Sequence, residues 1–287
     1  MIPFRKIVFP VDYTDACAGL VPYVKHMAEH FSAEITTVHA YVLPAVFYGY
    51  GEMAAVDFEW PAVEAAERRR LDEFTSQAFP GQKVAAIIGT GGAAEVIERV
   101  VREQGADLLM MPTRSRGPLR RLLLGSVTAK VMHDLSCAVW TGVHDVVTGY
   151  EARVPYHSIL CAVGWDEAAP VVIQNAAALA KSFNAKLTVV HAAETPPSSI
   201  GIDVATYRAQ VLEAGREHLT KLLRDCDVDV ESTVIEGSII DSIREEALRT
   251  RADLVVVGRG HARDTMGTFW SRLYGIVRES PCPVLSV

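Results

Sequence analysis

A run of residues suited to binding phosphate lies between two apolar segments in the first half of the chain. It combines hydroxyl side chains, two arginines and a later Gly-Ser pair: Thr113, Arg114, Ser115, Arg116, Gly125 and Ser126. Arginine binds phosphate through charge-assisted hydrogen bonds, and the free N–H groups at a helix start attract anions. The pattern predicts a phosphate-binding loop, and the simpler alternatives are a ligand-free helix cap and a solvated basic face.

Three further residues stand at or just after the ends of apolar segments, namely Asp12, His39 and Gly89. Ligands bind open α/β sheets at the carboxyl ends of their strands, so we expect these residues on the same rim as the loop. Two interpretations of Asp12 stay open: its carboxylate contacts a ligand, or it caps the following helix. His39 is read as a strand-end residue on the rim. Gly89 either contacts ribose or phosphate or belongs to a plain turn.

Motifs for catalysis or metal binding are absent from the sequence. The nine histidines show no H-E-x-x-H spacing, and no G-x-S-x-G elbow occurs, so we predict no metal site and no catalytic residue. The five cysteines form no C-x-x-C pair, as expected for reduced thiols in a cytoplasmic protein. The net charge of −7 argues against nucleic-acid binding. We expect no signal peptide and no membrane span.

An internal repeat organises the elements that must position these residues. Residues 7–12 match 159–164, 33–39 match 185–191, 106–112 match 252–258, and 136–140 match 281–285. Four matching segments in the same order indicate two copies of one domain, which we place at residues 1–146 and 154–287. Apolar runs alternate with amphipathic helical patterns in each copy. The sequence therefore predicts an α/β fold with a mainly parallel sheet that helices cover on both faces.

The second copy differs from the first at the rim. Gly164 stands where the first copy has Asp12, although Asp166 follows two residues later. Trp270 aligns with Gly125, and we expect an indole at that place to crowd a triphosphate. The second copy is therefore predicted to be a structural partner or to bind another ligand.

The segment from Pro112 to Ser126 resembles the phosphate loop of the universal stress protein family. Nucleotide-binding members carry G-x-x-G-x9-G-S/T there, and this chain has Pro112, Ser115, Gly125 and Ser126 at the motif positions. The final pair is kept, whereas proline lacks an N–H and serine carries a Cβ where the family has glycine. The resemblance covers nearly the whole chain, as two such domains in tandem.

This resemblance implies two doubly wound domains, each with a five-stranded sheet, related by a pseudo-twofold axis. It implies that the last strands, 138–140 and 284–287, pair with each other, and that Asp12 lies near the adenosine of a bound nucleotide. The paired domains would form an intramolecular pseudo-dimer, and homodimerisation through the aromatic-rich segment from Leu43 to Pro61 is left open.

We expect a cytoplasmic ligand-sensing or interaction module of the stress response with eroded nucleotide motifs. The alternative is an ATP- or AMP-binding switch that uses the first domain, with slow ATP hydrolysis. A third hypothesis is an unrelated α/β enzyme whose site in the second copy combines Asp166, His191, Arg259 and His261.

Overall fold

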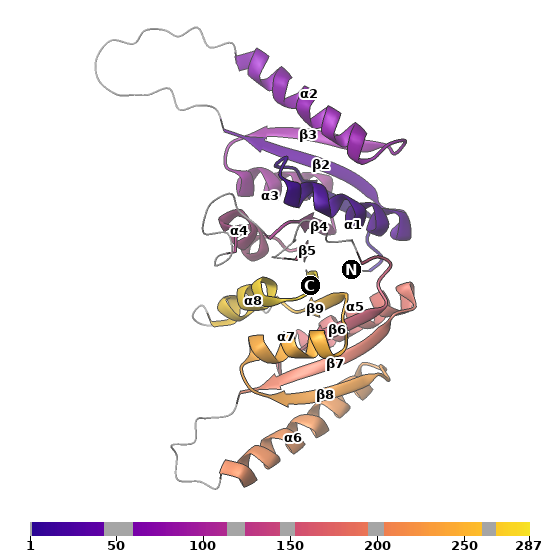
Figure 1. Ribbon diagram of the computed structural model, residues 1–287, viewed down its shortest axis with the longest axis vertical. Helices are drawn as coiled ribbons and strands as arrows, with labels where there is room; N and C mark the ends of the chain where they lie inside the picture. Colours follow the sequence, from indigo (N-terminus) through magenta and orange to yellow (C-terminus); the bar gives the residue numbers. More distant parts are fainter. Residues whose placement is uncertain (1, 43–59, 114–123, 144–152, 195–203, 260–267) are drawn as a thin grey trace, which may run out of the picture.

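One continuous sheet forms the centre of the molecule (Figure 1). The computed structural model describes residues 2–42, 60–113, 124–143, 153–194, 204–259 and 268–287. Within those ranges, ten strands pair in the order β3-β2-β1-β4-β5-β10-β9-β6-β7-β8. The first half contributes β1 (Lys6–Pro10), β2 (Glu34–Tyr41), β3 (Val84–Thr90), β4 (Leu108–Met111) and β5 (Ala138–Thr141). The second half contributes β6 (Ser158–Ala162), β7 (Lys186–Ala193), β8 (Glu231–Glu236), β9 (Leu254–Val257) and β10 (Val284–Ser286).

The strand order creates one switch point in each half. From β1 the chain adds β2 and β3 on one side and β4 and β5 on the other, and all these neighbours are parallel. The second half repeats this arrangement around β6. The predicted pair of doubly wound domains is confirmed. In each half, the chain crosses over to one side of the central strand, β1 or β6, and later to its other side. This reversal opens a crevice at the carboxyl end of the central strand.

Eight described helices cover the two faces of the sheet. One face carries α1 (Asp15–Phe31), α2 (Trp60–Ala78), α5 (Ala169–Phe183) and α6 (Val204–Asp225). The other carries α3 (Ala93–Gln104), α4 (Ser126–Asp134), α7 (Ile239–Arg249) and α8 (Thr268–Glu279). Figure 1 shows α2 and α6 at opposite ends of the molecule and both termini near its middle. The layers therefore continue across both halves.

The strands alternate between two apolar cores. Ile7 and Phe9 of β1 point into the core under α1 and α2, whereas Val8 points into the core under α3 and α4. The four residues of β4 alternate in the same way. Because successive side chains of a strand point to opposite faces, a strand that is covered on both sides must be apolar throughout. This explains why the sequence shows apolar runs here and not an apolar–polar alternation.

A repeated carboxylate ties the central strands together at their amino ends. Asp107 accepts hydrogen bonds from the backbone N–H of Arg5 (2.8 Å) and of Lys6 (3.1 Å) just before β4. Asp253 does the same before β9, where it accepts from His157 at 2.7 Å and Ser158 at 3.1 Å. Buried backbone N–H groups require partners, so the repeated Ala-Asp-Leu sequence has a structural cause.

The two halves join through their last strands. β10 pairs antiparallel with β5, with Leu285 opposite Trp140. The Trp140 indole donates to the Tyr156 hydroxyl at 2.9 Å, and both side chains are fully buried. The pairing that the resemblance implied is thus present, and each domain covers an edge that would otherwise expose unpaired backbone groups. The first domain limit, residue 146, and most of the aromatic-rich segment, residues 43–59, lie outside the described residues, whereas residue 154, the other limit, lies shortly before β6.

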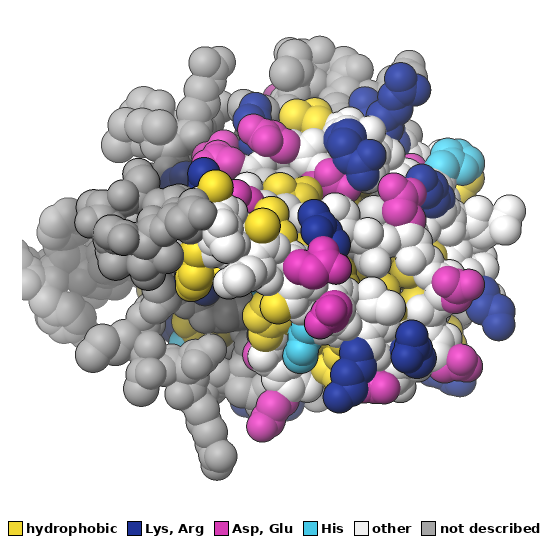
Figure 2. Space-filling model, turned by 90° about the horizontal axis from the view of Figure 1, so that it is seen from below, with side chains coloured by type: hydrophobic (Ala, Val, Ile, Leu, Met, Phe, Trp, Pro, Cys, Tyr) yellow, Lys and Arg dark blue, Asp and Glu magenta, His cyan; other side chains and the backbone are white. Residues whose placement is uncertain are grey.

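The surface is mixed in charge on the face shown in Figure 2, where acidic and basic side chains are interspersed around scattered apolar ones. None of the described helices combines the length and the apolar character that a membrane crossing needs.

Candidate functional site

Two cavities lie at equivalent places, one at each switch point. The first has a volume of about 360 Å³ and lies at the ends of β1, β2 and β4, beside the starts of α3 and α4. The second, of about 480 Å³, lies at the ends of β6, β7 and β9 and is closed by α5, α7 and α8. Open α/β sheets bind ligands at this position. The larger of these two cavities lies in the second half of the chain.

Asp12 lines the first cavity and also organises the start of α1. Its Oδ1 accepts hydrogen bonds from the Thr14 backbone N–H at 3.0 Å and from the Thr14 hydroxyl at 2.6 Å. Thr14 is the N-cap of α1 and accepts from the Cys17 N–H at 3.2 Å. The N-cap is therefore Thr14 and not Asp12, whose carboxylate supports the cap only through Thr14, and its contact with a ligand stays a prediction from its place on the cavity wall.

His39 lies beside Asp12 with one ring nitrogen already engaged. Its Nδ1 is 2.6 Å from the carbonyl oxygen of Val11, which can only accept, so Nδ1 carries the hydrogen. Nε2 lies 3.5 Å from the Glu67 carboxylate. The Tyr13 ring packs on the imidazole and carries the Arg70 guanidinium 3.9 Å above its centre. Burial raises the pKa of the Tyr13 hydroxyl to about 12, helped by the Glu67 charge, so it stays protonated.

The start of α4 forms the opposite wall of the first cavity. Gly125 is the N-cap and supplies no side-chain acceptor for the first turn. Its own N–H donates to the Thr113 carbonyl at 3.1 Å, while Gly125, Ser126, Val127 and Thr128 line the cavity. The first N–H groups of a helix lack intrahelical partners and carry a partial positive charge. This wall can therefore accept an anionic group.

The other predicted residues of the first site are placed differently. Gly89 lies inside β3, not at its end, and is not among the described residues that line the cavity. A Cβ at that position would lie 2.5 Å from a methyl group of Val96, so the glycine allows α3 to pack closely on β3. Thr113 is fully buried, and its hydroxyl has no hydrogen-bond partner among the described residues. Arg114, Ser115 and Arg116 lie outside the described residues.

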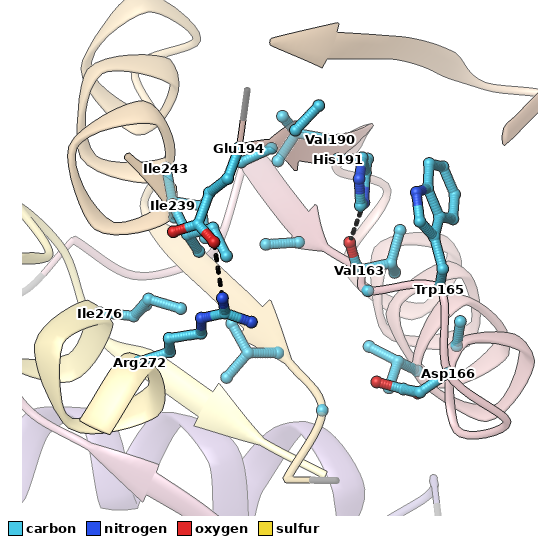
Figure 3. Close-up of a pocket in the computed structure, with 18 of the residues that line it drawn as sticks. Val163, Trp165, Asp166, Val190, His191, Glu194, Ile239, Ile243, Arg272 and Ile276 are labelled. Atoms are coloured by element: carbon cyan, nitrogen blue, oxygen red, sulfur yellow. Dashed lines mark hydrogen bonds and ion pairs between the residues drawn. The ribbon is translucent and has the colours of Figure 1, made fainter. Parts of the chain in front are cut away.

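The second cavity has an aromatic pair on one side and an ion pair on the other (Figure 3). Trp165 stacks on His191 with ring centres 3.6 Å apart, and His191 Nδ1 lies 2.9 Å from the Val163 carbonyl oxygen. Arg272 of α8 contacts Glu194 at 2.6 Å across the cavity. His39 and His191 thus make the same contact with the residue that follows the preceding strand. Each lies two residues before the end of its strand, β2 or β7, and not at the strand end as expected for His39.

The acid that the second copy lacks at residue 164 is restored from a neighbouring position. Asp166 Oδ1 accepts from the Ala168 N–H at 2.9 Å. Its Oδ2 lies 3.0 Å from the point that a Cβ on residue 164 would occupy. Gly164 leaves this space open, and the carboxylate of Asp166 fills the corner that Asp12 occupies in the first copy. Both cavities consequently have one carboxylate at the end of the central strand.

Two residues expected at the second site instead contact the first domain. Trp270 does not line the cavity; its indole packs on His133 of α4 with ring centres 4.7 Å apart, so the expected crowding is wrong. The Arg259 guanidinium donates to the carbonyl oxygens of Leu135, at 2.7 Å, and Cys137. Burial lowers the pKa of Arg259. Of the four residues in the third hypothesis, Asp166 and His191 line the cavity, Arg259 does not, and His261 lies outside the described residues.

No cysteine is among the described residues that line either cavity. Burial raises the pKa of Cys17 and of Cys282 to about 12 and that of Cys137 to about 11, which keeps these thiols protonated and unreactive. No three potential metal ligands cluster in the part of the chain that the structure describes. Sequence reasoning missed Trp165 and the Glu194–Arg272 pair, although the repeat aligns Trp165 with Tyr13 of the first rim and would have indicated it.

Comparison with known proteins gives a consistent assignment. The family model described as the universal stress protein family matches residues 3–141 and again residues 155–287. A universal stress protein of Thermus aquaticus is 29% identical over 136 residues, which cover 47% of this chain and 96% of that protein. Universal stress protein A homolog 1 of Coxiella burnetii is 31% identical over 138 residues, covering 46% and 96%. Each of these relatives corresponds to about one half of the chain.

Solved structures resemble the whole chain. A universal stress protein from Archaeoglobus fulgidus has a TM-score of 0.67 at 18% identity, covering 98% of this chain and 97% of that one. One from Pseudomonas aeruginosa has a TM-score of 0.64 at 16% identity, covering 99% and 93%. At these identities the likeness concerns the fold. Together with the two matches of the family model, it shows that the chain belongs to the universal stress protein family, with two of its domains in tandem.

Proposed function

We propose that the protein is a ligand-sensing member of the stress-response family and that its first cavity binds a nucleoside monophosphate. The observation that carries the proposal is the pairing of two walls across one apolar space. Asp12 stands on one wall, and the open start of α4 at Gly125 and Ser126 stands on the other. A nucleoside phosphate has hydrogen-bond donors at one end and an anion at the other, which suits this arrangement.

The size of the first cavity favours a short ligand. Its volume of about 360 Å³ is near the lower end of the range of roughly 300–1,000 Å³ for small-molecule sites. Val38, Ile97 and Met111 supply apolar surface for a base. Two family glycines are replaced in the loop, at Pro112 and Ser115, so close backbone contact with a long phosphate chain is reduced. These features support AMP over ATP.

The described walls favour binding over hydrolysis. The His39 Nδ1 hydrogen is held by the Val11 carbonyl, and Asp12 is the only carboxylate among the described residues of this wall. Phosphoryl transfer normally uses metal-binding carboxylates together with a group that orients water. We therefore propose a sensor whose output is a change in conformation or partner binding.

Calorimetric titration tests this proposal with variants that separate the two ends of the ligand. Ser126→Glu places a carboxylate at the start of α4, where it stabilises the helix but repels phosphate. We expect AMP affinity to fall at least about tenfold, whereas adenosine binding and protein stability are retained. Asp12→Asn should weaken both ligands, and the exposed Asp15→Asn is its matched control. Unchanged AMP affinity in Ser126→Glu, or no AMP binding at millimolar concentration, would refute the proposal.

A further inference from the structure

The second cavity differs from the first in the chemistry of its walls. We propose that it is a separate binding site for a small amphipathic amine, a molecule with an apolar body and one protonated nitrogen. This inference goes beyond the nucleotide proposed for the first cavity and does not depend on it. It stands on three observations: a largely apolar cavity, hydrogen-bond acceptors on His191 and Asp166, and an excess of one negative charge among the described charged lining residues, which are Asp166, Glu194 and Arg272.

The apolar space is formed by branched side chains from three helices and the sheet. Ile239 and Ile243 of α7 and Ile276 of α8 face Val172 of α5 and Val190 of β7. The volume of about 480 Å³ accommodates a single- or double-ring body. Trp165 is 44% exposed and lies on His191, so part of a flat, polarisable surface is available beside this space. Aromatic faces attract both rings and cations.

His191 offers an acceptor to the cavity. Its side chain is only 8% exposed, and its Nδ1 hydrogen is donated to the Val163 carbonyl. In the neutral ring Nε2 must then be an acceptor, and the described residues show no partner for it. Burial lowers the pKa of His191, His218 adds to this effect, and the bond to Val163 opposes it. The ring is therefore neutral at pH 7, and its Nε2 can accept a hydrogen bond from a ligand.

The charged groups of the cavity favour a cation. Arg272 is engaged by Glu194 at 2.6 Å, which neutralises both charges. The Asp166 carboxylate remains, with Oδ1 bound to the Ala168 N–H and Oδ2 at the corner above Gly164. Figure 3 shows Asp166 on the same side of the cavity as His191. A ligand with an ammonium group supplies hydrogen bonds to these acceptors, whereas a phosphate or carboxylate would face an unpaired negative charge.

Two probes of the same shape but opposite charge test the inference. Tryptamine carries an ammonium group on an indole, and indole-3-propionate carries a carboxylate on the same ring. By titration calorimetry on the full chain, we expect tryptamine to bind at least about tenfold more tightly than indole-3-propionate, because one carboxylate attracts the first and repels the second. Saturating AMP should not displace tryptamine, and this result is independent of whether AMP binds.

A charge-neutralising variant identifies the responsible group. Asp166→Asn should weaken tryptamine roughly fivefold and should not weaken indole-3-propionate, as expected for a partly exposed ion pair. Glu167→Gln is the matched control, because it removes the same charge from the neighbouring residue, whose side chain does not line the cavity. Equal affinity for both probes, preference for the carboxylate, no tryptamine binding at millimolar concentration, or equal effects of the two substitutions would each overturn the inference.

Discussion

Replacement of Arg259 by methionine should loosen the contact between the two domains. The guanidinium is 9% exposed and donates to the carbonyl oxygens of Leu135 and Cys137, at the end of α4 and the start of β5. It therefore links the loop after β9 in the second domain to the first domain. Methionine preserves most of the apolar stem of the side chain and removes the donors and the charge.

The magnitude follows from what the substitution leaves behind. Hydrogen bonds to a charged group each contribute about 1.5–3 kcal/mol, and a cation near a helix C-terminus adds about 0.3–1 kcal/mol. In the wild-type protein, burying the guanidinium costs free energy, and the lowered pKa of Arg259 reflects this cost. The cost offsets part of the stabilisation that the hydrogen bonds provide, and the variant avoids it. We therefore expect a net loss of about 2–4 kcal/mol in the free energy of unfolding.

Urea unfolding followed by tryptophan fluorescence measures this loss, since Trp140 is buried at the domain junction. Arg216→Met is the control, because Arg216 is exposed and paired with Glu213 on the same helix, and its loss should cost less than about 0.5 kcal/mol. Arg259→Lys should be intermediate, since one ammonium cannot replace the planar fork. Equal midpoints for Arg259→Met and Arg216→Met would refute the role assigned to this link.

Three further outcomes follow from the packing. Burial lowers the pKa of His26 and His30 below the ordinary value of 6.5, so the unfolded chain binds more protons below that pH. The contribution of these two histidines to the free energy of unfolding should therefore be constant above pH 7.5 and should fall as the pH drops through 6.5 toward their folded-state pKa values. In urea titrations, a His26→Gln, His30→Gln double variant should lose less free energy of unfolding between pH 7.5 and 5.5 than the wild type. Tyr156→Phe leaves the buried Trp140 N–H without its partner and should cost about 1–3 kcal/mol by thermal unfolding; an unchanged melting temperature would contradict the hydrogen bond. Gly275→Val places a side chain into α7 and should cost about 1–3 kcal/mol, whereas retention of wild-type stability would show that α7 and α8 can separate freely.

The fold was largely predictable from the sequence because local pattern and burial agree. β4 and β9, Leu108–Met111 and Leu254–Val257, lie within the matching apolar segments 106–112 and 252–258, since a strand covered on both faces must be apolar at every position. α3 lies between Gly92 and Gly105, and Gly105 takes the left-handed conformation that ends the helix. The internal repeat supplied the remaining order of elements.

The site was less predictable because its side chains turn according to contacts that are distant in the chain. The repeat places His39 and His191 at the ends of matching segments, and both make the same backbone contact. Alignment alone placed Trp270 in the second cavity, whereas the structure directs it toward α4. Nothing local in the sequence indicates this direction, because it depends on how β5 and β10 bring the two domains together.

The sequence by itself therefore determined the repeat, the parallel sheets and the rim at which the two cavities lie, since apolar periodicity and turn residues act over a few neighbouring positions. Only the tertiary structure decided that Asp166 replaces the missing acid at Gly164 and that Arg259 serves the domain contact. A loop side chain has several rotamers of similar energy, and long-range partners select among them. The chemistry of each cavity comes from residues of its own domain, whereas Arg259 and Trp270 serve the contact between the two domains.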